Sequence, residues 1–153
     1  METLDDAVIC PNCGSKFETA PPLQLNTSRT LLKFILLSII TLGIYAIVVM
    51  SKISTDINVI ASKYDGKKTM HYCLVIFVFS WLTLGIVPLV WNHKLSNRIG
   101  AELARRNIDY SFGAGTFWGW GFFGTLILVG PFIFLNKLFM SMNLLSADYN
   151  ARG

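Results

Sequence analysis

Two cysteines near the start of the chain are the residues best suited to chemistry. They form the string Cys10-Pro-Asn-Cys13-Gly, whose short spacing lets two thiolates reach one metal ion. A structural zinc ion needs four ligands, and the other candidates lie far away in the sequence: Cys73, His71 and His93. If the chain holds a cofactor, we expect zinc, at an incomplete site formed by Cys10 and Cys13. Three interpretations stay open: a half-site completed by a second subunit, the remnant of a zinc ribbon, or a redox dithiol.

No other set of residues has the spacing of a catalytic site. The chain contains no glycine-rich phosphate loop, no serine, histidine and aspartate set, and no pair of carboxylates in a plausible pocket. We therefore predict no catalytic residues, and we predict that the protein is not an enzyme.

The composition is that of a membrane protein. Of the 153 residues, 53% are apolar and 14% are charged, whereas about 25% of a soluble domain is charged. The net charge of +4 comes from basic residues spread along the chain. Basic residues that flank apolar segments usually contact lipid headgroups, so we expect the lipid bilayer, and not nucleic acid, as the partner.

Three uncharged apolar runs dominate the hydropathy of the chain after residue 28. They cover residues 34–50, 72–91 and 117–135, and each is close to the roughly 20 residues that a helix needs to cross a bilayer. We predict an all-α integral membrane protein with three spans, each followed by an amphipathic interfacial helix, and a small irregular N-terminal head. Basic residues follow the runs at positions expected to lie at the interface: Lys52, Lys94 and Lys137.

The runs also resemble one another. Ser38-Ile-Ile-Thr-Leu-Gly-Ile44 recurs as Ser80-Trp-Leu-Thr-Leu-Gly-Ile86, and the third run keeps a proline and a Lys-Leu ending. We predict a polar head at 1–28, with a Pro-rich linker, and a membrane domain at 29–153 built from three degenerate repeats at about 29–66, 70–107 and 114–150. Chance similarity of apolar sequence is the alternative. The motif residues are Thr41, Gly43, Tyr45, Thr83, Gly85, Pro88 and Pro131, and the two prolines are expected to kink their spans.

An amphipathic stretch follows each run. Apolar residues recur at helical spacing in all three: Ile53, Ile57, Ile60 and Tyr64; Leu95, Ile99 and Leu103; Leu138, Met142, Leu145 and Tyr149. Such a helix can lie in the membrane interface. It can equally extend straight out of the membrane and pack on its neighbours, and the pattern does not choose between the two.

The charges do not settle the topology. Three single crossings would place seven basic residues on one side and six on the other, so the usual basic bias is absent. Either the chain crosses three times, or each repeat dips into the membrane, turns near Gly43 or Gly85, and leaves on the same side. A turn inside the membrane exposes backbone groups to hydrocarbon, so we favour three crossings.

The strings Thr41-Leu-Gly-Ile-Tyr45 and Thr83-Leu-Gly-Ile-Val-Pro88 resemble a bacterial membrane family known as domain of unknown function 4234. Some of its members also carry an N-terminal Cys-Pro-x-Cys-Gly knuckle. The resemblance covers about residues 29–150, and the second copy departs from it at Val87, where the family has tyrosine. It implies a bacterial inner-membrane protein and supplies no biochemical activity.

These observations favour a non-enzymatic membrane scaffold or accessory subunit that binds itself or another membrane protein. A subunit of an oligomeric channel or carrier is the first alternative, with Thr41, Ser80 and Thr83 lining the path. A metal- or redox-responsive membrane protein acting through Cys10 and Cys13 is the second. We expect a multi-pass protein of the cell inner membrane, with a cytoplasmic N-terminus because a free cysteine pair suits a reducing compartment.

Overall fold

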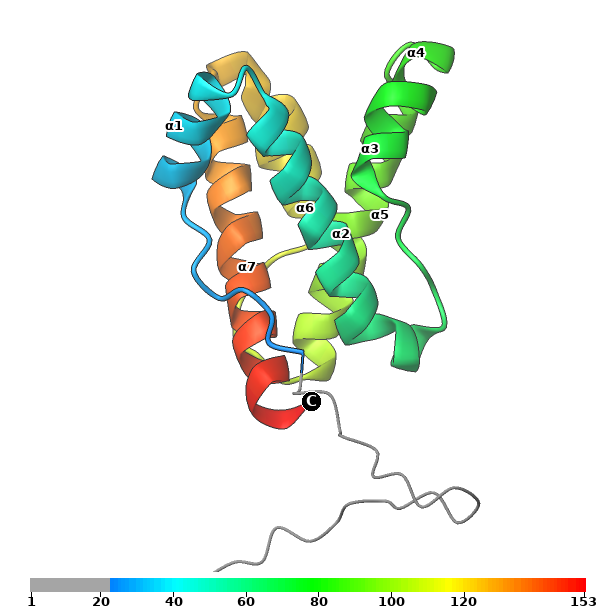
Figure 1. The fold of residues 1–153 in the computed structure, drawn as a ribbon, viewed down its shortest axis with the longest axis vertical. Helices are drawn as coiled ribbons and strands as arrows, with labels where there is room; N and C mark the ends of the chain where they lie inside the picture. Colours follow the sequence, from blue (N-terminus) through cyan, green and yellow to red (C-terminus); the bar gives the residue numbers. More distant parts are fainter. Residues whose placement is uncertain (1–22) are drawn as a thin grey trace, which may run out of the picture.

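The computed structural model describes residues 23–153, and every regular element in this part of the chain is a helix (Figure 1). The cysteine pair lies outside the described residues. Three long helices run side by side, and a shorter helical arm precedes each of them. In chain order the elements are α1 (Leu31–Ile40), α2 (Ile44–Asp65), α3 (Tyr72–Leu74), η1 (Val75–Phe79), α4 (Ser80–Leu82), α5 (Ile86–Arg105), α6 (Ala114–Thr116), η2 (Phe117–Phe122), η3 (Phe123–Ile127) and α7 (Gly130–Arg152).

A tight turn folds the first apolar run into a hairpin of α1 and α2. The Thr41 hydroxyl donates to the Leu37 carbonyl at 2.7 Å and accepts from the Tyr45 amide at 3.0 Å. The amide of Gly43 donates to the Ser38 carbonyl at 2.7 Å. Gly43 has φ = 90°, a conformation that favours glycine. The Thr-Leu-Gly string is therefore a helix-reversing turn.

The second run contains the same turn. The Thr83 hydroxyl donates to the Phe79 carbonyl at 2.6 Å and accepts from the Val87 amide at 3.2 Å. The Gly85 amide donates to the Ser80 carbonyl at 3.0 Å, and Gly85 has φ = 86°. The third run also reverses, but by a different route, through η3 and Leu128 at φ = 61°. All three turns lie at one end of the molecule (Figure 1).

Three continuous helical spans are therefore not found between residues 23 and 153. Each apolar run is divided by a turn. By length and composition, one helix of the described part, α2, could cross a membrane. The expectation that prolines kink the spans is wrong, because Pro88 and Pro131 lie in the first turns of α5 and α7. The first amides of a helix have no acceptor within that helix. A proline at these positions therefore removes no helical hydrogen bond.

The core lies between the second halves of α2, α5 and α7. The aliphatic residues and the methionine of the predicted stripes face one another there and are at most 1% exposed: Ile53, Ile57, Ile60, Leu95, Ile99, Leu103, Leu138, Met142 and Leu145. Of the two tyrosines predicted in these stripes, Tyr149 is partly buried and Tyr64 is 51% exposed. The interfacial-helix interpretation is therefore wrong for these segments, because no stripe is left for lipid. The second interpretation, helices that extend and pack on their neighbours, is the observed one.

Side-chain amides fasten the extended segments that lead into the hairpins. Asn58 of α2 exchanges two hydrogen bonds with the backbone of Thr69, at 2.9 and 2.7 Å. Asn143 of α7 holds the backbone of Arg29 in the same way, at 2.8 and 3.1 Å. Gly100 of α5 lies against the Phe112 carbonyl instead. Each long helix thus contacts the segment before the next hairpin, and α7 contacts the segment before the first.

Replacing Gly100 by alanine should destabilise the fold, because the new Cβ would overlap the Phe112 carbonyl oxygen and neither backbone can move alone. We expect a loss of about 1–3 kcal/mol, measured by denaturant unfolding in detergent with circular dichroism. Gly119→Ala is the matched control, since nothing lies within 4 Å of its added Cβ. Equal stability of Gly100→Ala and the wild type would contradict this close packing.

Candidate functional site

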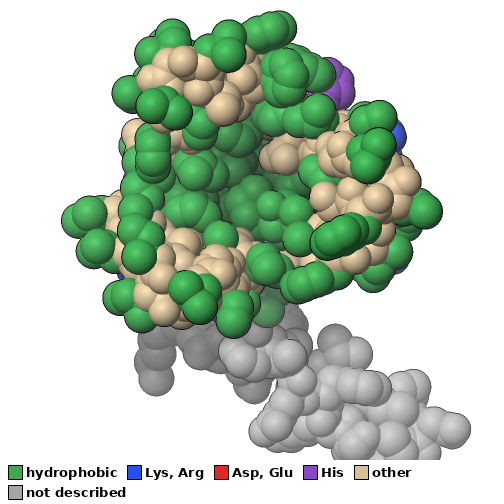
Figure 2. All heavy atoms as spheres, turned by 90° about the horizontal axis from the view of Figure 1, so that it is seen from above, with side chains coloured by type: hydrophobic (Ala, Val, Ile, Leu, Met, Phe, Trp, Pro, Cys, Tyr) green, Lys and Arg blue, Asp and Glu red, His purple; other side chains and the backbone are tan. Residues whose placement is uncertain are grey.

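The end of the molecule that carries the three turns has no charge. Residues 34–51, 72–92 and 110–136 contain no lysine, arginine, aspartate or glutamate, and together they form this end (Figure 1). Seen from above, it consists of three lobes around a hollow, with hydrophobic side chains over the lobes and within the hollow (Figure 2). Basic and histidine side chains appear only at the rim of that view. An apolar surface this large marks a site of interaction.

Leucines stand at the tips of the three turns. Leu42, Leu84 and Leu128 are 94%, 95% and 77% exposed. Their φ angles are 51°, 50° and 61°, and this left-handed conformation costs a residue with a side chain about 1–2 kcal/mol. Asparagine or glycine would suit each position better. The chain thus carries leucine where the backbone disfavours it and where the side chain packs against little of the protein.

Further apolar side chains surround the tips. Ile39, Ile40 and Ile44 flank the first turn, and all three are more than 60% exposed. At the second turn, Trp81 is 87% exposed. The apolar surface therefore extends over the arms as well as the turns.

Basic residues mark the boundary of the uncharged end. Lys52, Lys94 and Lys137 each lie nine positions after the residue that ends a turn, namely Gly43, Gly85 and Leu128. At 1.5 Å per residue this places them roughly 13 Å along their helices from the tips. None of the three forms an ion pair with a described residue, because every ion pair found in residues 23–153 is made by an arginine.

Arg98 fastens the segment after α2 to α5. Its guanidinium donates to both carboxylate oxygens of Asp65, at 2.7 and 3.0 Å, and to the Lys67 carbonyl at 2.6 Å. It also donates to the side chains of Asn58, Thr69 and Ser62. Burial alone would raise the pKa of Asp65, but the bonds and charges of Arg98 and Lys67 outweigh it and lower the pKa. Arg98 is therefore fully occupied within the fold.

A second charged cluster closes the polar end. Glu102, 4% exposed, accepts from Arg106 at 2.8 Å and from Arg105 at 2.5 and 2.9 Å. Arg106 also donates to Asp148 of α7 at 2.6 Å. Burial would raise the pKa of Glu102, but both arginines outweigh it and hold the pKa below its usual range. This cluster joins α5 to α7, and the Arg29–Asp56 pair joins the segment before α1 to α2.

The motif residues of the sequence serve the turns. The hydroxyls of Thr41 and Thr83 are both engaged within their own helix reversals. Tyr45 packs near Phe34, with ring centroids 6.4 Å apart.

Cys73 lies 3.3 Å from the Ser51 hydroxyl. Among residues 23–153, no group of three histidine, cysteine, aspartate or glutamate side chains could hold a metal ion.

The sequence prediction missed the two arginine clusters and the exposed tips. Arg98 pairs with Asp65 of α2 and Arg106 with Asp148 of α7, and no local pattern indicates pairs between helices. The pairs of Glu102 with Arg105 and Arg106 are local, at the i,i+3 and i,i+4 spacings of a helix. The tips did leave a signal, since a glycine preceded by threonine and leucine interrupts two of the three apolar runs. The glycine of that string can adopt the positive φ at which a helix ends.

Comparison with known proteins gives one family and no individual relative. Residues 29–101 match the family described as Domain of unknown function (DUF4234). The match starts ahead of α1 and ends within α5, so it includes both Thr-Leu-Gly turns and Arg98. No curated protein and no solved structure matches the chain. Over residues 29–101, which are just under half of its length, the chain is similar to the DUF4234 family.

Proposed function

We propose that this protein is a non-enzymatic membrane scaffold whose three hairpins enter one leaflet of the bilayer from the same side. The observation that carries the proposal is the uncharged end, whose tips are nearly fully exposed leucines. The helical bundle at the other end then stands in water and offers a surface to a partner. Both ends of the described chain lie on the polar side (Figure 1).

The depth of the apolar end fits half a bilayer. The lysines lie roughly 13 Å from the tips along their helices, and the hydrocarbon core of a bilayer is about 30 Å thick. Insertion up to Lys52, Lys94 and Lys137 therefore fills about one leaflet and leaves the ammonium groups at the headgroups. A complete crossing would draw these lysines into the hydrocarbon core.

The charges on α2 also favour this arrangement over a crossing by α2. Its second half carries Asp56, which pairs with Arg29, and Asn58, which holds Thr69. The stripe on the same half packs against α5 and α7. The longest uncharged segment of α2 is residues 44–51. Moving the second half into lipid would break these contacts.

The turns supply the hydrogen bonds that hydrocarbon cannot. A re-entrant turn is costly when backbone groups lose their partners in lipid. Here the threonine hydroxyl of each Thr-Leu-Gly turn accepts from an amide four residues later, and the glycine amide also has an acceptor. The objection that favours three crossings on sequence grounds is therefore weaker for these particular turns.

The repeats are part of the proposal. The hairpins share a reversal, a following lysine and a buried stripe, so we take them as three copies of one inserting unit. We also propose a cytoplasmic location for the bundle, since basic residues outnumber acidic ones there and cytoplasmic segments are enriched in lysine and arginine. Self-association or binding of another membrane protein would use the outer faces of the bundle.

Cysteine labelling in intact bacterial cells tests the proposal. The native cysteines are removed, and single cysteines replace Lys63, Ala104 and Ala147, which are exposed and follow the three apolar runs in turn. A membrane-impermeant maleimide is applied before and after lysis. One-sided insertion with a cytoplasmic bundle predicts that all three sites are protected until lysis.

A cysteine in place of Leu84 is the control for depth. It should stay unlabelled after lysis and react only when detergent dissolves the membrane. Labelling of sites 63 and 147 in intact cells, with site 104 protected, would instead establish three crossings and overturn the proposal. Labelling of all three sites in intact cells would overturn the cytoplasmic location and leave insertion from one side standing.

A further inference from the structure

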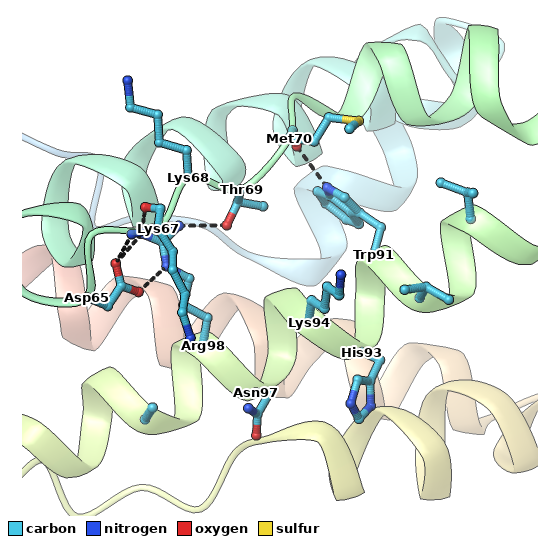
Figure 3. A pocket seen from close by; sticks show the side chains of 13 residues that line it. Asp65, Lys67, Lys68, Thr69, Met70, Trp91, His93, Lys94, Asn97 and Arg98 are labelled. Carbon is cyan, nitrogen blue, oxygen red and sulfur yellow. Dashed lines mark hydrogen bonds and ion pairs between the residues drawn. The ribbon is translucent and has the colours of Figure 1, made fainter.

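We propose that a groove between residues 65–70 and α5 binds the headgroup of one anionic phospholipid, whose acyl chains lie on the apolar wall above it. This inference rests on the proposed insertion into one leaflet. The groove is a cavity of about 720 Å³. Its lysines come from both walls, Lys67 and Lys68 from the segment after α2 and Lys94 from α5 (Figure 3).

The groove has an excess of positive charge. Lys67, Lys68 and Lys94 form no ion pair with any residue in 23–153. The one acidic side chain that lines the groove, Asp65, is bound by Arg98 through both oxygens. The ammonium groups of Lys67 and Lys94 are therefore left to an external anion, and a phosphodiester supplies the acceptor oxygens that they lack. Lys68 also lines the groove, but its side chain extends away from α5 (Figure 3).

The walls of the groove change from basic to apolar toward the membrane. Val87, Val90 and Met70 line it beside the lysines, and Val87 and Val90 lie between Lys94 and the tip of the second hairpin. A ligand with a charged head and an apolar tail matches this order. A free phosphate ion would use the lysines and leave the apolar wall empty.

Trp91 holds the two walls in place. It is 6% exposed, and its indole nitrogen donates to the Met70 carbonyl at 2.8 Å (Figure 3). Arg98 fastens the lower part of the same segment through Asp65 and the Lys67 carbonyl. The groove is thus fixed before any lipid arrives, and prior fixing of a site lowers the entropic cost of binding.

The corresponding place beside the first hairpin is much smaller. There the segment before α1 lies against α2, and the cavity, lined by Lys33 and Lys52 among others, holds about 90 Å³. Both lysines sit at the same boundary of the apolar end, yet the space is too small for a phospholipid headgroup. The inference therefore concerns one lipid at the second hairpin.

The test is lipid binding by the purified full chain in a neutral detergent, followed by native mass spectrometry with added phosphatidylglycerol or phosphatidylcholine. We compare the triple variant Lys67→Gln/Lys68→Gln/Lys94→Gln with the matched triple Lys33→Gln/Lys52→Gln/Lys137→Gln, which removes the same charge elsewhere at the boundary. The wild type should retain one phosphatidylglycerol in preference to phosphatidylcholine. The groove triple should bind it at least about tenfold more weakly, while the matched triple keeps it.

Each other result overturns the inference. Equal losses in both triples would mean diffuse electrostatic attraction without a site, and no loss in the groove triple would place the lipid elsewhere. Displacement of the bound lipid by inorganic phosphate alone would mean that the site takes a free anion. Flotation with neutral phosphatidylcholine vesicles is measured beside these experiments. If the protein does not float, the proposed insertion into one leaflet is wrong, whereas the lipid preference in detergent is decided by the mass spectrometry alone.

Discussion

Replacing Leu42 and Leu84 together by asparagine should stabilise the fold in detergent and, at the same time, strongly weaken its insertion into membranes. Both leucines hold φ near 50°, and asparagine tolerates this conformation better. We expect a gain of about 1 kcal/mol for each position in the free energy of unfolding. Denaturant unfolding of the purified variant in detergent measures it.

Insertion should change in the opposite direction. Transfer of a leucine side chain from water to an apolar medium is worth about 1.5–3 kcal/mol, and both side chains are at least 94% exposed. Losing two of them should weaken partitioning into vesicles by at least about a hundredfold. Vesicle flotation of the wild type and the variant gives this ratio.

Leu23→Asn is the matched control for both measurements. Leu23 is 60% exposed and precedes the helices on the polar side, so its replacement should leave flotation unchanged. If the double variant at the tips floats as well as the wild type, the tips do not enter the membrane and the proposed function fails. If its stability falls, the leucines make contacts that compensate for their backbone conformation.

Replacing Glu102 by alanine should be the most damaging single change at the polar end. It removes the acceptor shared by Arg105 and Arg106 and leaves Arg106, 8% exposed, with Asp148 as its one carboxylate. Removal of one partner from a buried ion pair costs about 3–5 kcal/mol. Denaturant unfolding should show this loss, and Arg105→Ala, at the more exposed partner, should cost much less.

The same cluster makes stability depend on pH. The pKa of Glu102 lies below its ordinary value of 4.5 because the arginine contacts outweigh burial. The folded state therefore binds the proton less readily than the unfolded chain, so this contribution is present above pH 4.5 and is lost as pH falls through the lowered pKa. Glu102→Gln should make the decline in unfolding free energy below that pH shallower. An unchanged slope would mean that Glu102 does not carry this contribution.

The core residues could be predicted from the sequence, but what they pack against could not. Apolar spacing identified Ile53, Ile57 and Ile60, and all three are fully buried. The same spacing suits a helix lying on a membrane, because the pattern records only that one face avoids water. Whether lipid or protein covers that face depends on the relative placement of three helices, which no single stretch contains.

The length of the apolar runs was also ambiguous. A run of about 20 residues suits one membrane span, and it suits equally a hairpin of two shorter arms. The charge balance along the chain did not decide between the two, since it gave no orientation for three crossings. The decisive residues were Gly43 and Gly85, together with the threonine hydroxyls that satisfy the turns.

The way α7 holds the first hairpin has a consequence for the order in which the protein is made. Asn143 bonds Arg29 across 114 positions of sequence, and Asn150 bonds Leu25 across 125. The first hairpin leaves the ribosome long before either asparagine is synthesised. Until then the segment before this hairpin lacks its hydrogen bonds to α7. The fold closes as a ring only when synthesis has delivered its last helix.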